Sequence, residues 1–130
     1  MILVKTTLKE SKIEGIGLFA DEFIPKDTWI WRYQSGFDLE VKPAELENLS
    51  KEALKQFEKY AYLSRKSQNY ILCFDDARFF NHSKNPNVSC LFDPDLNDED
   101  ICYATRDILK GEELTCNYRD FDAGESEDFI

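Results

Sequence analysis

The chain has 130 residues, which is the size of one domain with its own core. Hydrophobic residues make up 42% of it, with only five Gly and four Pro, so the composition excludes a disordered protein. The formal net charge of −10 argues against direct binding to nucleic acid and favours a basic partner, although solubility alone would also account for it.

Short runs of β-branched and aromatic residues recur between turn-forming residues. They predict strands at 2–8, 28–34, 69–74, 87–92, 101–106 and 113–118. From Pro43 to about Ala61 the composition changes to Ala, Glu, Leu, Lys and Gln, with Leu54 and Phe57 at helical spacing and Ser50 placed as an N-cap. We therefore expect a mainly β fold of small sheets with a helical insert at about 43–61.

The four cysteines are spread along the chain without a C-x-x-C pair. They are Cys73, Cys90, Cys102 and Cys116. Each lies in an apolar or β-like run, which is typical of buried free thiols and not of a zinc site or a disulfide framework. No run approaches the length of a membrane span, and the N-terminus lacks a signal-peptide core. We expect an intracellular, cytoplasmic protein, nuclear in a eukaryote, without membrane association.

His82, the chain's one histidine, lies in the polar stretch 79–87, FFNHSKNPN. A serine-histidine-acid site or a histidine metal site would need a second specific partner, and nothing in the sequence marks one. The acidic run 93–100 has part of the spacing of a calcium loop. However, Asp98 stands where that loop needs Gly, and Ala104 stands where it needs Glu. A solvated hairpin loop is favoured, and no metal site is predicted.

Three stretches resemble, in order, the successive motifs of the SET-domain lysine methyltransferases. They are 15–20 (GIGLFA), 77–87 (ARFFNHSKNPN) and 111–118 (GEELTCNY). The resemblance spans residues 1 to about 121 and leaves 122–130 as an acidic tail. It implies a β-clip fold of several small sheets with a threaded C-terminal pseudoknot. It also implies S-adenosylmethionine as cofactor and the side-chain amine of a protein lysine as substrate.

The resemblance also implies which residues bind the cofactor. They are Gly15, Ile16, Gly17, Leu18, Arg78, Asn81, His82 and Tyr118. In the family, backbone carbonyls of the first motif meet the methionine ammonium, which glycine permits by letting the backbone come close. Asn81 would add a side-chain acceptor, and the backbone of His82 would pair with adenine. Arg78 would hold the carboxylate or its loop. The alternatives are a surface salt bridge from Arg78 to a neighbouring aspartate and a turn-stabilising bond from Asn81.

Tyr118 is the catalytic candidate, because in the family its hydroxyl lies beside the transferring methyl and the target amine. A direct in-line displacement needs alignment and electrostatic support instead of a protein nucleophile. The alternative is a buried strand tyrosine. Tyr62, Cys116 and Phe121 are weaker candidates for the lysine channel, and for Tyr62 ordinary core packing explains the residue equally well. Cys116 stands at a position associated with the number of methyl groups added, so product multiplicity is open.

One departure from the family concerns the C-terminus, which has no cysteine-rich segment after Tyr118. Phe121 or Phe129 could cover the cofactor instead, or a second subunit in a homodimer or the substrate could complete the site. The function predicted is methyl transfer to lysine in a basic protein substrate. The alternative is a weakly active or inactive SET-fold module that binds a basic partner protein.

Overall fold

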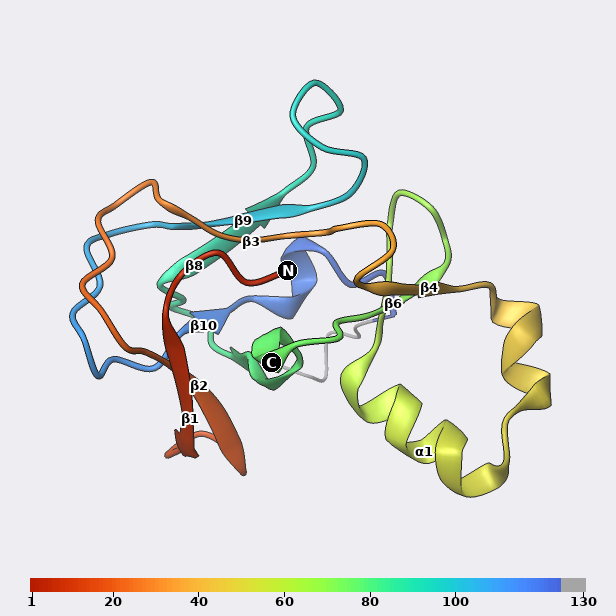
Figure 1. Cartoon of the computed structure of the whole chain (residues 1–130). Helices are drawn as coiled ribbons and strands as arrows, with labels where there is room; N and C mark the ends of the chain where they lie inside the picture. Colours follow the sequence, from red (N-terminus) through yellow and green to blue (C-terminus); the bar gives the residue numbers. More distant parts are fainter. Residues whose placement is uncertain (125–130) are drawn as a thin grey trace.

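The computed structural model describes residues 1–124, and Figure 1 shows short strands in small sheets with one α-helix within that range. The strands are β1 (Thr6–Glu10), β2 (Ile16–Ala20), β3 (Trp29–Arg32), β4 (Leu39–Val41), β5 (Tyr62–Leu63), β6 (Tyr70–Leu72), β7 (Asn81–His82), β8 (Val88–Leu91), β9 (Ile101–Ala104) and β10 (Thr115–Cys116). The helices are α1 (Lys51–Tyr60) and the 3-10 turns η1 (Pro43–Asn48), η2 (Asp76–Phe79) and η3 (Tyr118–Asp120). The predicted fold class is confirmed.

The first motif forms the second strand of a hairpin, and the strand prediction included only the region of the first strand, at 2–8. β1 and β2 pair antiparallel, with Thr6 opposite Ala20, and Gly15 makes the turn at a φ of 48°. In β2, Ile16 is exposed, whereas Leu18 and Ala20 are fully buried and reach the core. Its glycines hid this strand in the sequence, because glycine is depleted in strands.

The core lies around the three-stranded sheet β3-β9-β8, in which all neighbours are antiparallel. Its buried side chains come from both halves of the chain. They include Leu18, Ile24, Ile30, Trp31, Val88, Ala104, Ile108 and Leu114. Because these residues join the first and last motifs to the same core, the two chain segments are fixed relative to each other.

The helical insert begins where the sequence indicates. The Ser50 hydroxyl accepts a hydrogen bond from the Ala53 N–H (3.1 Å), which caps α1. Phe57 is the buried residue of α1, and its ring packs edge-on against Tyr70 of β6 at 5.7 Å. Tyr70 belongs to the sheet β4-β6-β5, so the insert is docked on that sheet.

The second and third motifs meet through a parallel pair of strands. Thr115 and Cys116 of β10 lie opposite Asn81 and His82 of β7. The buried Asn87 fixes this pairing, because its amide donates to the Glu113 carbonyl (2.8 Å) and accepts from the Thr115 N–H (2.9 Å). These bonds hold the C-terminal segment against residues from the middle of the chain, as the expected C-terminal pseudoknot requires.

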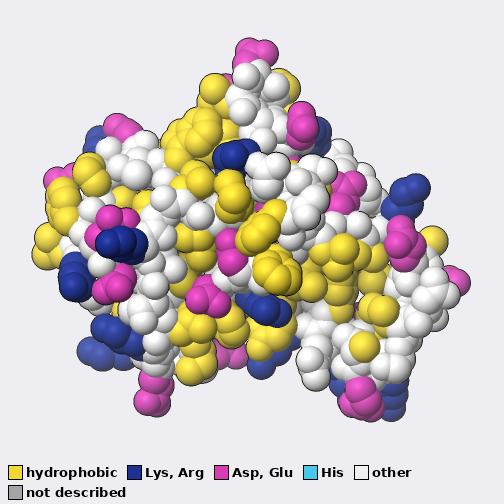
Figure 2. Space-filling model, viewed as in Figure 1, with side chains coloured by type: hydrophobic (Ala, Val, Ile, Leu, Met, Phe, Trp, Pro, Cys, Tyr) yellow, Lys and Arg dark blue, Asp and Glu magenta, His cyan; other side chains and the backbone are white. Residues whose placement is uncertain are grey.

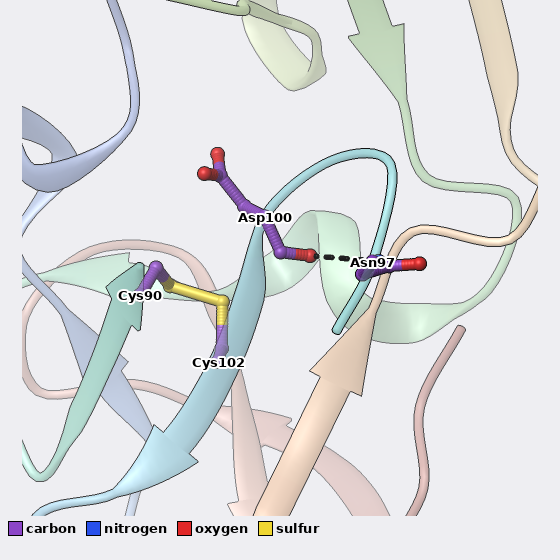
Figure 3. Close-up of a disulfide and its surroundings, with 4 residues drawn as sticks. All are labelled: Cys90, Asn97, Asp100 and Cys102. Carbon is purple, nitrogen blue, oxygen red and sulfur yellow. Dashed lines mark hydrogen bonds between the residues drawn. A yellow bond between two sulfur atoms is a disulfide. The ribbon is translucent and has the colours of Figure 1, made fainter. Parts of the chain in front are cut away.

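Cys90 and Cys102 form a disulfide, so the prediction of free thiols is wrong for this pair (Figure 3). The two residues lie directly opposite across β8 and β9, with Cα atoms 4.0 Å apart. Their separation of 12 residues carries no motif, and only the strand register brings them together. Cys73 and Cys116 are free and buried, as expected.

The acidic connection between β8 and β9 is exposed from Pro94 to Leu96 and again at Asp98, which agrees with a hairpin loop. Glu99 and Asp100, in contrast, are buried, so the expectation of a solvated run is wrong at its end. Within residues 1–124 no group of three or more His, Cys, Asp or Glu side chains is arranged to hold a metal ion. Over the same range, no helix has the length and apolar character needed to cross a membrane.

The contacts of the C-terminal segment continue past residue 121, where we expected the domain to end. The Asp122 carboxylate accepts a hydrogen bond from the Leu63 N–H (3.1 Å), and the Ala123 N–H donates to the Leu63 carbonyl (2.8 Å). Residues 122 and 123 therefore pack on β5. Phe129, the other candidate for a cofactor cover, lies outside the described residues.

Candidate active site

A cavity of about 560 Å³ lies where the three motifs meet, within the range of ~300–1,000 Å³ typical of small-molecule sites. Eight of the residues expected at the site line it. They are Gly15, Ile16, Tyr62, Arg78, Asn81, Cys116, Tyr118 and Phe121. The expected residues Gly17, Leu18 and His82 do not line it.

The end of the cavity at the first motif is organised by Asn81. Its amide nitrogen donates to the Glu14 carbonyl (3.1 Å) and to the Glu113 carboxylate (2.8 Å). Glu113 also accepts a hydrogen bond from the Ser11 hydroxyl (2.8 Å). Because these acceptors use both amide hydrogens, the orientation of the amide is fixed, and its oxygen is left as an acceptor.

Gly17 and Leu18 support this end of the cavity from behind. A Cβ on Gly17 would lie 2.3 Å from a Glu113 carboxylate oxygen, so only glycine leaves room for that carboxylate. Leu18 is fully buried, and its carbonyl accepts a hydrogen bond from the Leu114 N–H (2.7 Å). Both residues therefore position the hairpin against the third motif instead of facing the cavity.

Arg78 lines the cavity through contacts with aromatic rings. Its guanidinium carbon lies 5.7 Å from the centre of the Tyr60 ring and 5.8 Å from that of Phe79. Among the described residues it forms no ion pair with Asp75 or Asp76, which removes the salt-bridge alternative. The Asp75 carboxylate instead accepts hydrogen bonds from backbone N–H groups.

Tyr118 is held by two hydrogen bonds to the second motif. Its hydroxyl donates to the Phe80 carbonyl, and its backbone N–H donates to Nδ1 of His82 (3.1 Å). The sequence indicated only a backbone role for His82, so this use of the imidazole is new. Burial, together with the positive charges of Arg119 and Lys84, lowers the pKa of His82 and favours the neutral ring that this bond requires.

The three weaker candidates all contact the same part of the cavity. The ring of Phe121 packs edge-on against Tyr62 (4.9 Å between centres) and Tyr118 (5.9 Å). Cys116 is buried, lies opposite His82 of the second motif and lines the same cavity, and burial raises the pKa of its thiol, which stays protonated. Within residues 1–124, Phe121 of the C-terminal segment thus places an aromatic ring beside Tyr62 and Tyr118.

The comparison with protein families decides the identity of this fold. The model of the SET domain matches residues 15–119, which is most of the chain and includes all three motifs. The chain belongs to the SET-domain family. The motif resemblance noted in the sequence is therefore confirmed.

This SET domain is similar to histone-lysine methyltransferases of fungi and animals. It is 32% identical over 117 residues to the histone-lysine N-methyltransferase trr of Drosophila melanogaster, covering 86% of this chain and 5% of that protein. It is 35% identical over 114 residues to an H3 lysine-4 specific histone-lysine N-methyltransferase of Chaetomium globosum, covering 84% of this chain and 10% of that protein. The chain thus spans only a small part of the length of these relatives.

Solved structures support the fold of the SET domain. The Chaetomium thermophilum Polycomb Repressive Complex 2 bound to GSK126 matches 93% of this chain and 16% of its own chain, with a TM-score of 0.70 and 21% identity. A Plasmodium falciparum crystal structure matches 97% of this chain and 98% of its own, with a TM-score of 0.64 and 22% identity. These similarities concern the arrangement of the elements.

Sequence reasoning missed two buried polar residues of the SET domain that line the cavity, Trp31 and Asp100. The sequence around Trp31 predicts an ordinary core residue of a strand. Only its indole N–H, which has no hydrogen-bond partner among residues 1–124, distinguishes it from other core residues. Asp100 is the last of a run of acids, and the sequence signal was its position directly before the apolar stretch ICYA. Because Asp100 lies between an acidic loop and a buried strand, its residue type alone did not show that it is buried.

Proposed function

We propose that this SET domain transfers a methyl group from S-adenosylmethionine to the side-chain amine of lysine in a basic protein, with histones as the first substrates to test. The observation that carries the proposal is one cavity that is lined by residues of the three motifs, including Asn81 and Tyr118. The names of the relatives support the same chemistry and the same class of substrate.

The residues at the Asn81 end fit the amino acid part of this cofactor. An ammonium needs acceptors, and Gly15, Ile16 and Asn81 line the cavity, so we assign their backbone and amide oxygens to it. A carboxylate needs a cation, and the guanidinium of Arg78 lines the same region without an ion pair in the described part of the chain. For adenine we keep the backbone of His82, whose side chain instead holds Tyr118.

The role we assign to Tyr118 follows from its hydrogen bonds. Its hydroxyl donates to the Phe80 carbonyl, and because a phenol oxygen can accept as well as donate, we assign it the lysine amine as a donor partner in the substrate complex. S-adenosylmethionine supplies an activated methyl group, so the protein needs no nucleophile of its own. Tyr118, Tyr62 and Phe121 would align the amine and exclude water, which is the main requirement of such a displacement.

The surface gives weaker support for a basic partner. Figure 2 shows acidic and basic side chains interspersed on the face seen there, so the acid excess is not gathered into a single patch on that face. We therefore assign any attraction of lysine-rich segments to the overall charge of −10 and to groups in the cavity. Action on histones would place the protein in the nucleus of a eukaryotic cell.

The test is a pair of measurements on the purified chain. Calorimetry should show binding of S-adenosylmethionine, and incubation with core histones and labelled cofactor should transfer label to lysine, located by mass spectrometry. The absence of binding at millimolar cofactor would refute the proposal. Binding without transfer to any lysine substrate would favour the alternative, a module that keeps the fold and the cofactor site but not the reaction.

A further inference from the structure

Asp100 is a buried carboxylate with no bonding partner. It is 8% exposed and lies directly before β9, and its side chain extends away from Asn97 (Figure 3). Its backbone carbonyl accepts hydrogen bonds from the Tyr33 N–H (3.3 Å) and the Asn97 amide (3.4 Å). Within residues 1–124 its carboxylate accepts no hydrogen bond and forms no ion pair. Such a group costs stability unless a ligand pairs with it.

Asp100 also lies between two adjoining cavities. It lines the main cavity together with Tyr118, and with Phe121 it lines a second cavity of about 340 Å³. The rest of the second cavity is formed by Arg65, Lys66, Phe92 and Asp120. A side chain that entered through the second cavity would therefore pass Asp100 and Phe121 before reaching Tyr118.

Two residues that line the main cavity also hold fully buried polar atoms that have no hydrogen-bond partner in the described residues. They are the Tyr62 hydroxyl and the Trp31 indole N–H. An ammonium has three N–H donors, and Asp100, which lines the cavity, carries a carboxylate that can accept from it. Buried polar groups are normally paired, so this carboxylate fits a cationic ligand, whereas the indole N–H of Trp31 is itself a donor and cannot bind a cation.

Among residues 1–124, the charged residues near Asp100 form other contacts and do not pair with its carboxylate. Glu99 is buried and its carboxylate accepts a hydrogen bond from the Ser64 hydroxyl (2.6 Å). Lys66 lies over the ring of Phe92, 4.7 Å from its centre, and forms no ion pair with a carboxylate of residues 1–124. Burial and the negative charge of Glu99 raise the pKa of Asp100 to about 7, while Arg65 and Lys66 act in the opposite direction.

We propose that Asp100 binds the ammonium of the target lysine as it enters past Phe121 and guides it toward Tyr118, where the ammonium releases one proton to solvent and the neutral amine accepts the methyl group. The inference rests on the proposed function and adds to it a substrate-binding residue that the three motifs do not contain. Because an approaching cation stabilises the ionised carboxylate, substrate binding and ionisation of Asp100 favour each other.

The test compares Asp100→Asn with Asp98→Asn, which removes the same charge from an exposed position of the same loop. For Asp100→Asn we expect the KM for core histones to rise about tenfold or more, since hydrogen bonds to charged groups are the stronger ones. The dissociation constant of S-adenosylmethionine should change less than about twofold, as expected for a group at the other end of the cavity. Asp98→Asn should match the wild type in both.

The pH profile separates binding from a structural role. In the wild type, the KM for histones should fall as pH rises through about 7, and in Asp100→Asn that dependence should disappear. Asp100→Glu keeps the charge and should recover part of the loss. An unchanged KM and an unchanged pH profile in Asp100→Asn would overturn the inference.

A second measurement does not depend on activity. With S-adenosylhomocysteine bound, addition of n-butylammonium should lower the pKa of the Asp100 carboxyl measured by carbon NMR, and the Asp98 carboxyl should not respond. No response of Asp100 would overturn the inference even for an inactive chain. Failure of the proposed function is a different result, namely no binding of S-adenosylmethionine at all.

Discussion

The two ends of the cavity differ in how their polar groups are bonded. At the Asn81 end, the amide hydrogens, the Glu113 carboxylate and the Ser11 hydroxyl are bonded to one another. At the Asp100 end, the carboxylate of the buried Asp100 accepts no hydrogen bond among residues 1–124, and the buried Tyr62 hydroxyl and Trp31 indole N–H also have no partner there. The polar groups of the first end are thus already paired in the free chain, whereas the Asp100 carboxylate would gain a partner from a bound cation.

The largest expected effect lies between the two ends. Tyr118→Phe should lower kcat for methyl transfer by about 100-fold or more, because it removes an oxygen positioned beside the reacting groups. Binding of S-adenosylmethionine should persist, measured by calorimetry. Tyr103→Phe, which removes a hydroxyl outside the cavity, is the matched control. A wild-type kcat for Tyr118→Phe would contradict the role assigned to this tyrosine.

The next effect concerns the strand pairing that supports both ends. Asn87→Ala should lower the free energy of unfolding by about 2–4 kcal/mol, because the backbone groups of Glu113 and Thr115 would lose their partners. Urea denaturation followed by circular dichroism measures this change. Asn85→Ala, at an exposed position of the same turn, should change it by less than about 0.5 kcal/mol. Equal effects of the two substitutions would show that Asn87 does not hold β10.

The Asp100 end should gain stability when its charge is removed. The folded protein holds a proton on Asp100 up to about pH 7, whereas the unfolded chain releases it near 3.8, so stability falls as pH rises between these values. Asp100→Asn should therefore be more stable than the wild type at pH 8, by roughly 1–3 kcal/mol, and similar to it near pH 4. Thermal denaturation at both pH values tests this, and a destabilised variant at pH 8 would contradict an unpaired carboxylate.

The smallest effect is expected behind the Asn81 end. Gly17→Ala should displace the Glu113 carboxylate and weaken cofactor binding by up to about tenfold, because the Asn81 amide loses one fixed acceptor. Ser11→Ala removes one donor to Glu113 without a steric clash and should weaken binding less. Calorimetric titration measures both. Normal affinity in Gly17→Ala would mean that the position of Glu113 does not matter for the cofactor.

Much of the fold and of the cavity could be predicted from the sequence. Turn residues and β-branched runs indicated the strands of the core, and Ser50 marked the start of α1, because these signals are local. The motifs indicated residues that the structure brings into one cavity, including Asn81, Tyr118 and Phe121. The roles of these residues remain proposals.

The features that the sequence did not reveal depend on contacts between distant segments. The disulfide follows from the register of β8 and β9, and the contact of His82 with Tyr118 follows from the pairing of β7 with β10. Asp100 is the clearest case. Its residue type and its acidic neighbours predict an exposed loop position. In the structure it lies directly before β9 and lines the cavity.

The most direct test of the two-ended cavity is a crystal structure of the chain with bound S-adenosylhomocysteine. The account predicts that the ligand's ammonium lies within hydrogen-bonding distance of the Asn81 amide oxygen and that the ligand leaves the space between Tyr118 and Asp100 open. A ligand ammonium bound to Asp100, or a ligand outside this cavity, would contradict it.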